Sequence, residues 1–169
     1  MTDFIIRPLT SADAAQWRTL RLEALHRYPT AFASAYEEAL EQDLSARIPP
    51  PDGPSVLFGA FVGGTLSGSA GLHVWPGMKQ RHKSELWGMY VAPLLHRRGV
   101  GAALLSAVIE HARTRVAVVP LTVLRANSAA KALYSRFGFV SYGIEKRALR
   151  HQGIDHDDEL MALDLGNGL

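Results

Sequence analysis

The segment Val91–Leu104 combines residues that can bind an anionic group. An apolar run ends at the start of this range, Gly99 and Gly101 follow, and an alanine- and leucine-rich helix is expected to begin at once. A helix N-terminus carries unpaired backbone N–H groups and a partial positive charge, and glycines let a phosphate approach them closely. Arg97 and Arg98 add two cations beside this turn. The segment therefore predicts a cradle for a diphosphate.

Two known nucleotide-binding loops fit this turn poorly. A dinucleotide-binding fingerprint needs a third glycine where Leu104 stands and an acidic residue about 20 positions later, and no Asp or Glu lies between Glu110 and Glu145. A P-loop needs Gly-Lys followed by Ser or Thr, which is absent. An ordinary strand-to-helix connection is the plain alternative, because a Gly-x-Gly pair alone is a weak signal.

A second candidate segment is Asn127–Phe139. Asn127 stands at an expected helix N-cap, and Tyr134 follows seven residues later. Seven residues at about 100° each return to within roughly 20° of the same direction, about 10 Å along the axis, so the two side chains share one helix face. Each has a structural explanation by itself, Asn127 as a cap and Tyr134 as a core aromatic.

Together, the two segments resemble the signature of the GCN5-related N-acetyltransferase (GNAT) family. That signature is an Arg/Gln-x-x-Gly-x-Gly/Ala loop followed by Asn-x-x-Ala-x-x-x-Tyr-x-x-x-Gly-Phe, and the match covers roughly residues 85–139. More weakly, the whole strand and helix order is similar, including the final stretch Asp157–Met161. One departure is His96, which stands where the family usually has Arg or Gln. Imidazole can still donate a hydrogen bond, so the departure affects only the detail of a diphosphate contact.

The resemblance implies acetyl-CoA as co-substrate and a set of residues that bind it. The diphosphate would be held by backbone N–H groups of the turn, and the pantetheine arm would pair with the edge of the preceding strand in a gap where neighbouring strands separate. Asn127 would contact the arm, the Val91 N–H would polarise the thioester carbonyl, and Tyr134 would act as the acid for the departing thiolate. The expected binding residues are Met89, Tyr90, Val91, Arg97, Arg98, Gly99, Val100, Gly101, Ala102, Ala103 and Asn127.

Glu85 is the candidate for the base that deprotonates the amine, acting through water. Strict alternation would place Glu85, Trp87, Met89 and Val91 on one face of a strand if no bulge intervenes. A solvated carboxylate at the start of a strand explains Glu85 equally well.

Other polar residues give weaker signals. His151, His156, Asp157 and Asp158 match no recognised ligand spacing in what is expected to be a polar loop, so no metal is predicted. His73 beside Trp75 would line the acceptor pocket or, more simply, face solvent.

The acidic residues Glu37, Glu38 and Glu41 would, by the resemblance, lie near the acceptor site. They would attract a cationic amine there or simply form a solvated helix face.

The elements expected to position these residues alternate between strands and helices. Strands are expected at 4–7, 56–62, 65–75, 85–91, 116–124, 139–144 and 159–165, with helices to about 27 and over 33–47, 101–115 and 127–136. In the first of these helices Arg18, Arg21 and Glu23 are expected at water or at a rim. Gly63 and Gly64 suit a tight hairpin turn. This order predicts a single α/β domain over residues 1–169, with a mixed, mostly antiparallel, GNAT-like central sheet and helices on both faces.

Composition narrows the function further. The chain has 169 residues, no cysteine and a formal net charge of +2 spread along its length. Disulfides, thiolate metal sites and an acyl-cysteine relay are therefore excluded. Nothing resembles a nucleic-acid-binding stripe, a signal peptide or a membrane span, so a cytoplasmic protein without a nucleic-acid or membrane partner is expected.

The predicted function is N-acetyl transfer from acetyl-CoA to a primary amine of a small molecule or peptide, by direct attack in a ternary complex. Transfer of a different acyl group, or a CoA-binding regulatory module without turnover, are the alternatives. Pocket size near Trp87 and Met89 would decide the acyl group. The identity of the amine and the oligomeric state are left open, with a homodimer as one expectation.

Overall fold

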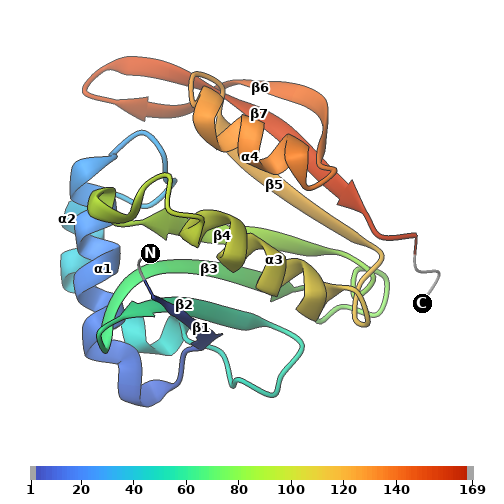
Figure 1. Ribbon diagram of the computed structural model, residues 1–169. Coiled ribbons are helices and arrows are strands. Elements are labelled where there is room, and N and C mark those ends of the chain that lie inside the picture. The colour runs from blue at the N-terminus through green and yellow to red at the C-terminus, as the bar shows by residue number, and fades with distance from the viewer. Residues whose placement is uncertain (1–2, 167–169) are drawn as a thin grey trace.

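The computed structural model describes residues 3–166, which form two antiparallel sheets with helices on both faces (Figure 1). The elements, in chain order, are β1 Ile5–Pro8, a 3-10 turn Ser11–Asp13, α1 Ala14–Arg27, α2 Tyr36–Glu41, a 3-10 turn Leu44–Arg47, β2 Val56–Val62, β3 Thr65–Val74, β4 Ser84–Val91, a 3-10 turn Pro93–Leu95, α3 Val100–Ala112, β5 Val118–Leu124, α4 Ser128–Arg136, β6 Val140–His151 and β7 Ile154–Asp164. The predicted α/β class is confirmed.

The sheet divides between β4 and β5, in agreement with the gap between neighbouring strands that the resemblance implies. One sheet has the strand order β1-β2-β3-β4 and the other β5-β7-β6, with antiparallel neighbours throughout. A single parallel bridge between Lys83 and Val118 joins them. Figure 1 shows β4 and β5 close together at this end and separated at the other. Their separation leaves one edge of β4 unpaired beyond the bridge.

Two apolar cores hold this arrangement. α3 contributes Leu104, Leu105 and Val108, all fully buried, to a core that it shares with both sheets and with α4. Full burial of each such side chain contributes about 1.5–3 kcal/mol. On the opposite face, Trp17 and Leu20 of α1 pack in a second core. α1 and α3 thus pack on opposite faces of the first sheet, and the core beneath α3 also joins the second sheet.

The helix predicted over 33–47 is interrupted. α2 ends at Glu41, and the Asp43 carboxylate accepts hydrogen bonds from the backbone N–H and the hydroxyl of Ser45. Such local side-chain bonds compete with helix continuation, so the chain turns into the 3-10 segment that ends at Arg47. Arg18 of α1 secures the break by donating to the carbonyls of Leu40 and Gln42.

The last two strands are longer than predicted. β6 and β7 extend to a tight turn at Gln152 and Gly153, whose φ angles are 49° and 78°. His151 and His156 therefore lie in strands and not in the polar loop predicted from the sequence. Among residues 3–166, no helix is long and apolar enough to cross a membrane.

Candidate active site

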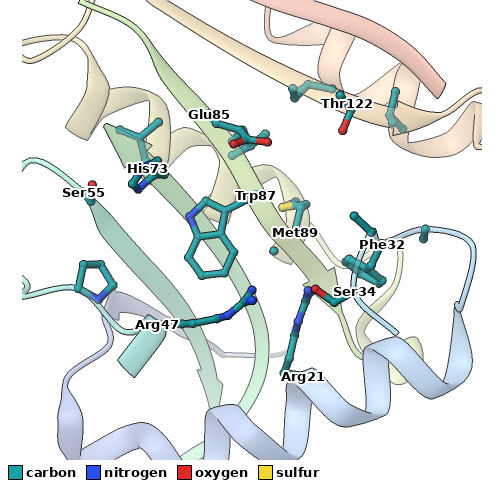
Figure 2. A pocket seen from close by; sticks show the side chains of 18 of the residues that line it. Arg21, Phe32, Ser34, Arg47, Ser55, His73, Glu85, Trp87, Met89 and Thr122 are labelled. Carbon is teal, nitrogen blue, oxygen red and sulfur yellow. The ribbon is translucent and has the colours of Figure 1, made fainter. Parts of the chain in front are cut away.

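A cavity of about 830 Å³ occupies the space between the separated strands. Its walls come from β4, β5, the start of α4, and the segments around α2 that connect α1 to β2. Figure 2 shows Glu85, Trp87 and Met89 along β4, with Thr122 of β5 across the gap. Both Trp87 and Met89, which were expected to limit the size of the acyl group, line the cavity.

A bulge in β4 changes which side chains share a face. Ser69 pairs with Tyr90 and Gly71 with Trp87, so Gly88 and Met89 together stand opposite one residue of β3. Gly88 has a φ of 61°, and its carbonyl accepts a hydrogen bond of 2.9 Å from the Ser69 hydroxyl. The extra residue reverses the alternation beyond this point.

The common face of Glu85, Trp87, Met89 and Val91, which was expected only without a bulge, is therefore not formed. Met89 and Val91 pack against the core beneath α3, whereas Trp87 joins the core beneath α1. Tyr90 also packs beneath α1, where its hydroxyl donates a hydrogen bond of 2.8 Å to Glu23. Desolvation and this contact with Glu23 raise the pKa of Tyr90. Only the backbone of Tyr90 is available for the pairing predicted from the sequence.

The N-terminus of α3 has the features of the predicted anion cradle. Gly99 is its N-cap with a φ of 81°, and no described carbonyl accepts from the N–H groups of Gly99, Val100, Gly101 and Ala102. The Ala103 N–H donates to the Gly99 carbonyl at 3.0 Å, and the Arg98 N–H donates to the Leu95 carbonyl at 3.4 Å. The backbone N–H groups of Ala103 and Arg98 are therefore already used, and fewer donors are free than the sequence predicted over residues 97–103. The Arg97 side chain is exposed beside them.

His96 contacts the backbone of β4, whereas the sequence suggested a contact with the diphosphate. Its Nε2 lies 2.8 Å from the Val91 carbonyl, to which it donates. This hydrogen bond links the turn before α3 to the end of β4, and so it holds the start of α3 at a fixed distance from the edge of β4.

Asn127 and Tyr134 both line the cavity from α4, as their spacing predicts. The Asn127 side-chain oxygen caps the helix by accepting from the Ala130 N–H at 3.1 Å. Tyr134 is 6% exposed, and its hydroxyl has no hydrogen bond to a described residue, since burial is the only cause of its pKa shift. Desolvation raises its pKa to about 12. The hydroxyl therefore stays protonated at neutral pH and is available as a donor.

Glu85 and His73 line the cavity from adjacent strands. The half-buried His73 ring lies edge-on to Trp75, with ring centroids 4.8 Å apart. Of the two positions considered for His73, the structure supports the one in the wall of a cavity. The cavity thus has two groups that can accept a proton.

Two arginines of the cavity wall were missed by the sequence analysis. Arg21 of α1 is 8% exposed and lines the cavity, although it was expected at water or at a rim. Arg47 lines the same cavity from the 3-10 turn after α2. The available signal was spacing: Arg21 follows Trp17 by four residues and precedes Ala24 by three, which places it on the buried stripe of α1.

The acidic residues of α2 lie between two segments of the cavity wall but do not reach the cavity. None of Glu37, Glu38 and Glu41 lines the cavity, and all three are exposed on α2. The solvated helix face is the explanation that the geometry supports.

Polar residues of the β6–β7 hairpin form ion pairs. The Asp157 carboxylate binds Lys146 at 3.0 Å and Arg125 at 3.4 Å, and Asp155 pairs with Arg150. Within residues 3–166, no group of three or more His, Asp or Glu side chains is placed to hold a metal ion.

Comparison with known proteins agrees with this geometry. Residues 17–139 match the model of the Acetyltransferase (GNAT) family. The chain belongs to this family.

Two curated relatives are N-acetyltransferases with different acceptors. The chain is 29% identical over 114 residues to "Aminoglycoside N(6')-acetyltransferase type 1" of Klebsiella aerogenes, covering 66% of this chain and 72% of that protein. It is 38% identical over 97 residues to "N-alpha-acetyltransferase RimI" of Mycobacterium tuberculosis, covering 57% of this chain and 60% of that protein. The protein is an acetyl-CoA-dependent N-acetyltransferase, which transfers an acetyl group to an amine.

The fold is also that of solved acetyltransferases. The putative acetyltransferase yncA from Salmonella typhimurium, solved with acetyl-CoA, superimposes with a TM-score of 0.80 at 20% identity, covering 99% of this chain and 97% of that one. That protein binds acetyl-CoA on the same architecture.

Proposed function

We propose that this protein acetylates a small amine by direct attack in a ternary complex, with the reaction centre in the cavity between β4 and β5. The observation that carries the proposal is the meeting of three elements at Gly101. A Cβ built there would lie 3.5 Å from Met89 Cε of β4 and 3.5 Å from Leu133 Cδ2 of α4. The start of α3 with its free N–H groups, the unpaired edge of β4 and α4 thus lie next to one another, and Met89 and Asn127 of these elements also line the cavity. This arrangement fits a diphosphate at α3 followed by an extended arm that leads into the cavity.

Acetyl-CoA, when bound, supplies an activated thioester carbonyl. The free N–H groups of Gly99, Val100, Gly101 and Ala102 would bind its diphosphate, assisted by Arg97. The unpaired edge of β4 near Val91 would donate a backbone N–H to the thioester carbonyl oxygen and stabilise the negative charge that develops there. Asn127 keeps its amide N–H groups for the arm because its oxygen is used by the helix cap.

Tyr134 would donate its proton to the departing sulfur. A free thiol has a pKa near 8.5, well below the pKa of about 12 that desolvation gives to Tyr134. The same desolvation disfavours a thiolate in this cavity and raises the basicity of the sulfur. The C–S bond breaks as the C–N bond forms, the sulfur takes the Tyr134 proton, and Tyr134 regains a proton from the second N–H that the nitrogen loses as the amide forms.

Glu85 would accept the proton of the attacking ammonium, directly or through water. An alkylammonium has no free electron pair, so the proton must leave before attack. His73 stands on the neighbouring strand at the same level and is the competing base. No cysteine or acyl-enzyme step is needed, because the amine and the thioester occupy one cavity.

The test is thiol release from acetyl-CoA with a panel of primary amines, together with CoA binding by calorimetry, for the wild type and for Tyr134→Phe. The proposal requires turnover with at least one amine and a kcat reduced about 100-fold in Tyr134→Phe with unchanged CoA affinity. Propionyl-CoA in parallel tests the alternative acyl group. Tight CoA binding without turnover on any amine would support a regulatory module instead.

Three further expectations from the sequence remain predictions for this protein: a single domain, a cytoplasmic location and a homodimer. Light scattering of the purified chain in solution tests the last of these.

A further inference from the structure

Arg21 is a buried cation without an anionic partner. Its side chain is 8% exposed, and among the described residues it has no ion pair or hydrogen bond. Its guanidinium lies over the Phe32 ring, 4.7 Å from the centroid. Burial, with a smaller effect of the positive charge on Arg47, lowers the pKa of Arg21 to about 10. An unpaired buried charge costs free energy, so this position is poorly explained by stability alone.

Arg47 brings a second cation to the same wall. It comes from the 3-10 turn after α2, far from Arg21 in sequence, and no described carboxylate pairs with it. Figure 2 shows the ends of both arginine side chains turned into the cavity, between the Trp87 ring and Ser34. Arg47 is an exposed residue, so water screens part of the repulsion between the two cations, and an anion bound between them would remove it.

The charges of the cavity are divided between its two ends. In Figure 2, Arg21 and Arg47 lie on one side of the Trp87 ring, and Glu85 lies on the other side near Thr122. A substrate with a cationic amine and an anionic group at a short distance would match both ends at once. A polycationic amine would instead be repelled by the arginine pair, and the N-terminus of a protein would bring no carboxylate to it.

We propose that the acceptor is a small amino acid-like amine whose carboxylate is bound by Arg21 and Arg47 while its amine faces Glu85. This inference rests on the proposed transferase function and specifies its substrate class. Arginine forms bidentate, charge-assisted hydrogen bonds with carboxylates, and two arginines would fix the acid end firmly. The apolar side chain of such an acceptor would pack against Trp87 and Phe32, which also line the cavity.

The experiment compares matched acceptors in the thiol-release assay. Each of the twenty amino acids is tested beside its α-amide and its decarboxylated amine, with kanamycin and a peptide free at its N-terminus as further probes. At least one amino acid should have a kcat/KM about 30-fold or more above that of its amide, since a charge-assisted contact of this kind is worth about 10–100-fold. The corresponding 1-aminoalkylphosphonate shows whether the site prefers a carboxylate or a phosphonate.

Variants separate anion binding from structural effects. Arg47→Gln and Arg21→Met should each raise the KM for the amino acid at least tenfold and leave the KM for its amide nearly unchanged. Arg21→Met should keep or raise the unfolding temperature, because it removes an unpaired buried charge. Arg27→Gln is the matched control: Arg27 is an exposed arginine of α1, pairs with Glu23 and lies outside the cavity. It should change neither KM.

Failures of the two proposals are distinguishable. Equal turnover of amino acids and their amides, or a preference for kanamycin or the peptide, would overturn the anionic subsite while the transferase function stands. A protein that binds CoA but neither binds nor acetylates any amino acid would also overturn the anionic subsite. Absence of CoA binding would overturn both.

Discussion

Glu85 on β4 lies directly opposite His73 on β3 in the antiparallel register, and both side chains line the cavity between the two sheets. Each can accept a proton, so the geometry alone offers two bases for one reaction.

Replacement of each group separately identifies the base. Because Glu85 lies on the strand whose free edge faces the gap, Glu85→Gln is expected to lower kcat at pH 7 by about 100-fold and to shift the acid limb of the pH–rate profile. His73→Gln should change kcat less than threefold. Thiol-release assays at pH values from 5 to 10 measure kcat and its pH dependence for both variants. The opposite ranking would assign the base to His73.

Gly99 is expected to be essential for CoA binding through its backbone conformation. Its φ is 81°, and an added Cβ would meet no atom within 4 Å, so Gly99→Ala costs only backbone strain of about 1–2 kcal/mol. Relief of that strain would rotate the free N–H groups at the start of α3. We expect CoA affinity to fall by about tenfold or more, measured by calorimetry.

Gly64 provides a matched control for this substitution. It has a φ of 82°, equally open space and a position in the β2–β3 turn, outside the cavity. Gly64→Ala should cost similar stability and leave the Kd of CoA unchanged. Equal losses of affinity in the two variants would show that strain, and not the cradle, controls binding.

Asn127 has two separable roles, which two substitutions distinguish. Asn127→Asp keeps the oxygen that caps α4 but loses the amide donors, whereas Asn127→Ala loses both. We expect both variants to bind CoA more weakly, and only the alanine variant to lose about 1 kcal/mol of unfolding free energy. Urea unfolding and calorimetry measure the two effects. Normal CoA binding by Asn127→Asp would restrict this residue to capping.

The start of α1, the helix that carries Arg21, should weaken at low pH. Arg7 donates two hydrogen bonds of 2.8 Å to the two oxygens of Asp13, and the Thr10 N–H donates a third of 2.9 Å. Chiefly through the Arg7 bonds, the pKa of Asp13 falls from 3.8 to about 2. A pKa lowered by folding gives stability that is present above about pH 4 and is lost as the pH falls through 2.

Asp13→Asn measures this contribution. The variant should be less stable than the wild type at pH 7 by on the order of 1–2 kcal/mol, and the difference should shrink between pH 4 and 2. Urea unfolding at several pH values is the measurement. Asp155→Asn, whose partner Arg150 is largely exposed, should have a far smaller effect. A difference that does not depend on pH would contradict the role of this pair.

The cradle and the α4 face could be predicted from the sequence because they are local. The turn around Gly99 and the spacing from Asn127 to Tyr134 lie within single short segments, where helix geometry fixes which groups point together. The order of strands and helices could also be predicted from the apolar periodicity. The ends of the strands and the break in the helix at Asp43 could not be predicted in this way. Local hydrogen bonds, such as the one from Ser45 to Asp43, decide such ends.

Packing between elements far apart in sequence forms the end of the cavity where we propose that the acceptor binds. The bulge at Gly88 accepts a hydrogen bond from Ser69 of another strand, and the bulge reverses the faces of Met89 and Val91. Arg21 and Arg47 meet only because α1 and the turn after α2 pack over the same gap. The sequence by itself determined the reaction class through short motifs of backbone and helix geometry. The proposed acceptor class rests on the charges of Arg21 and Arg47, which packing brings together, and residues so far apart in sequence leave no periodic signal.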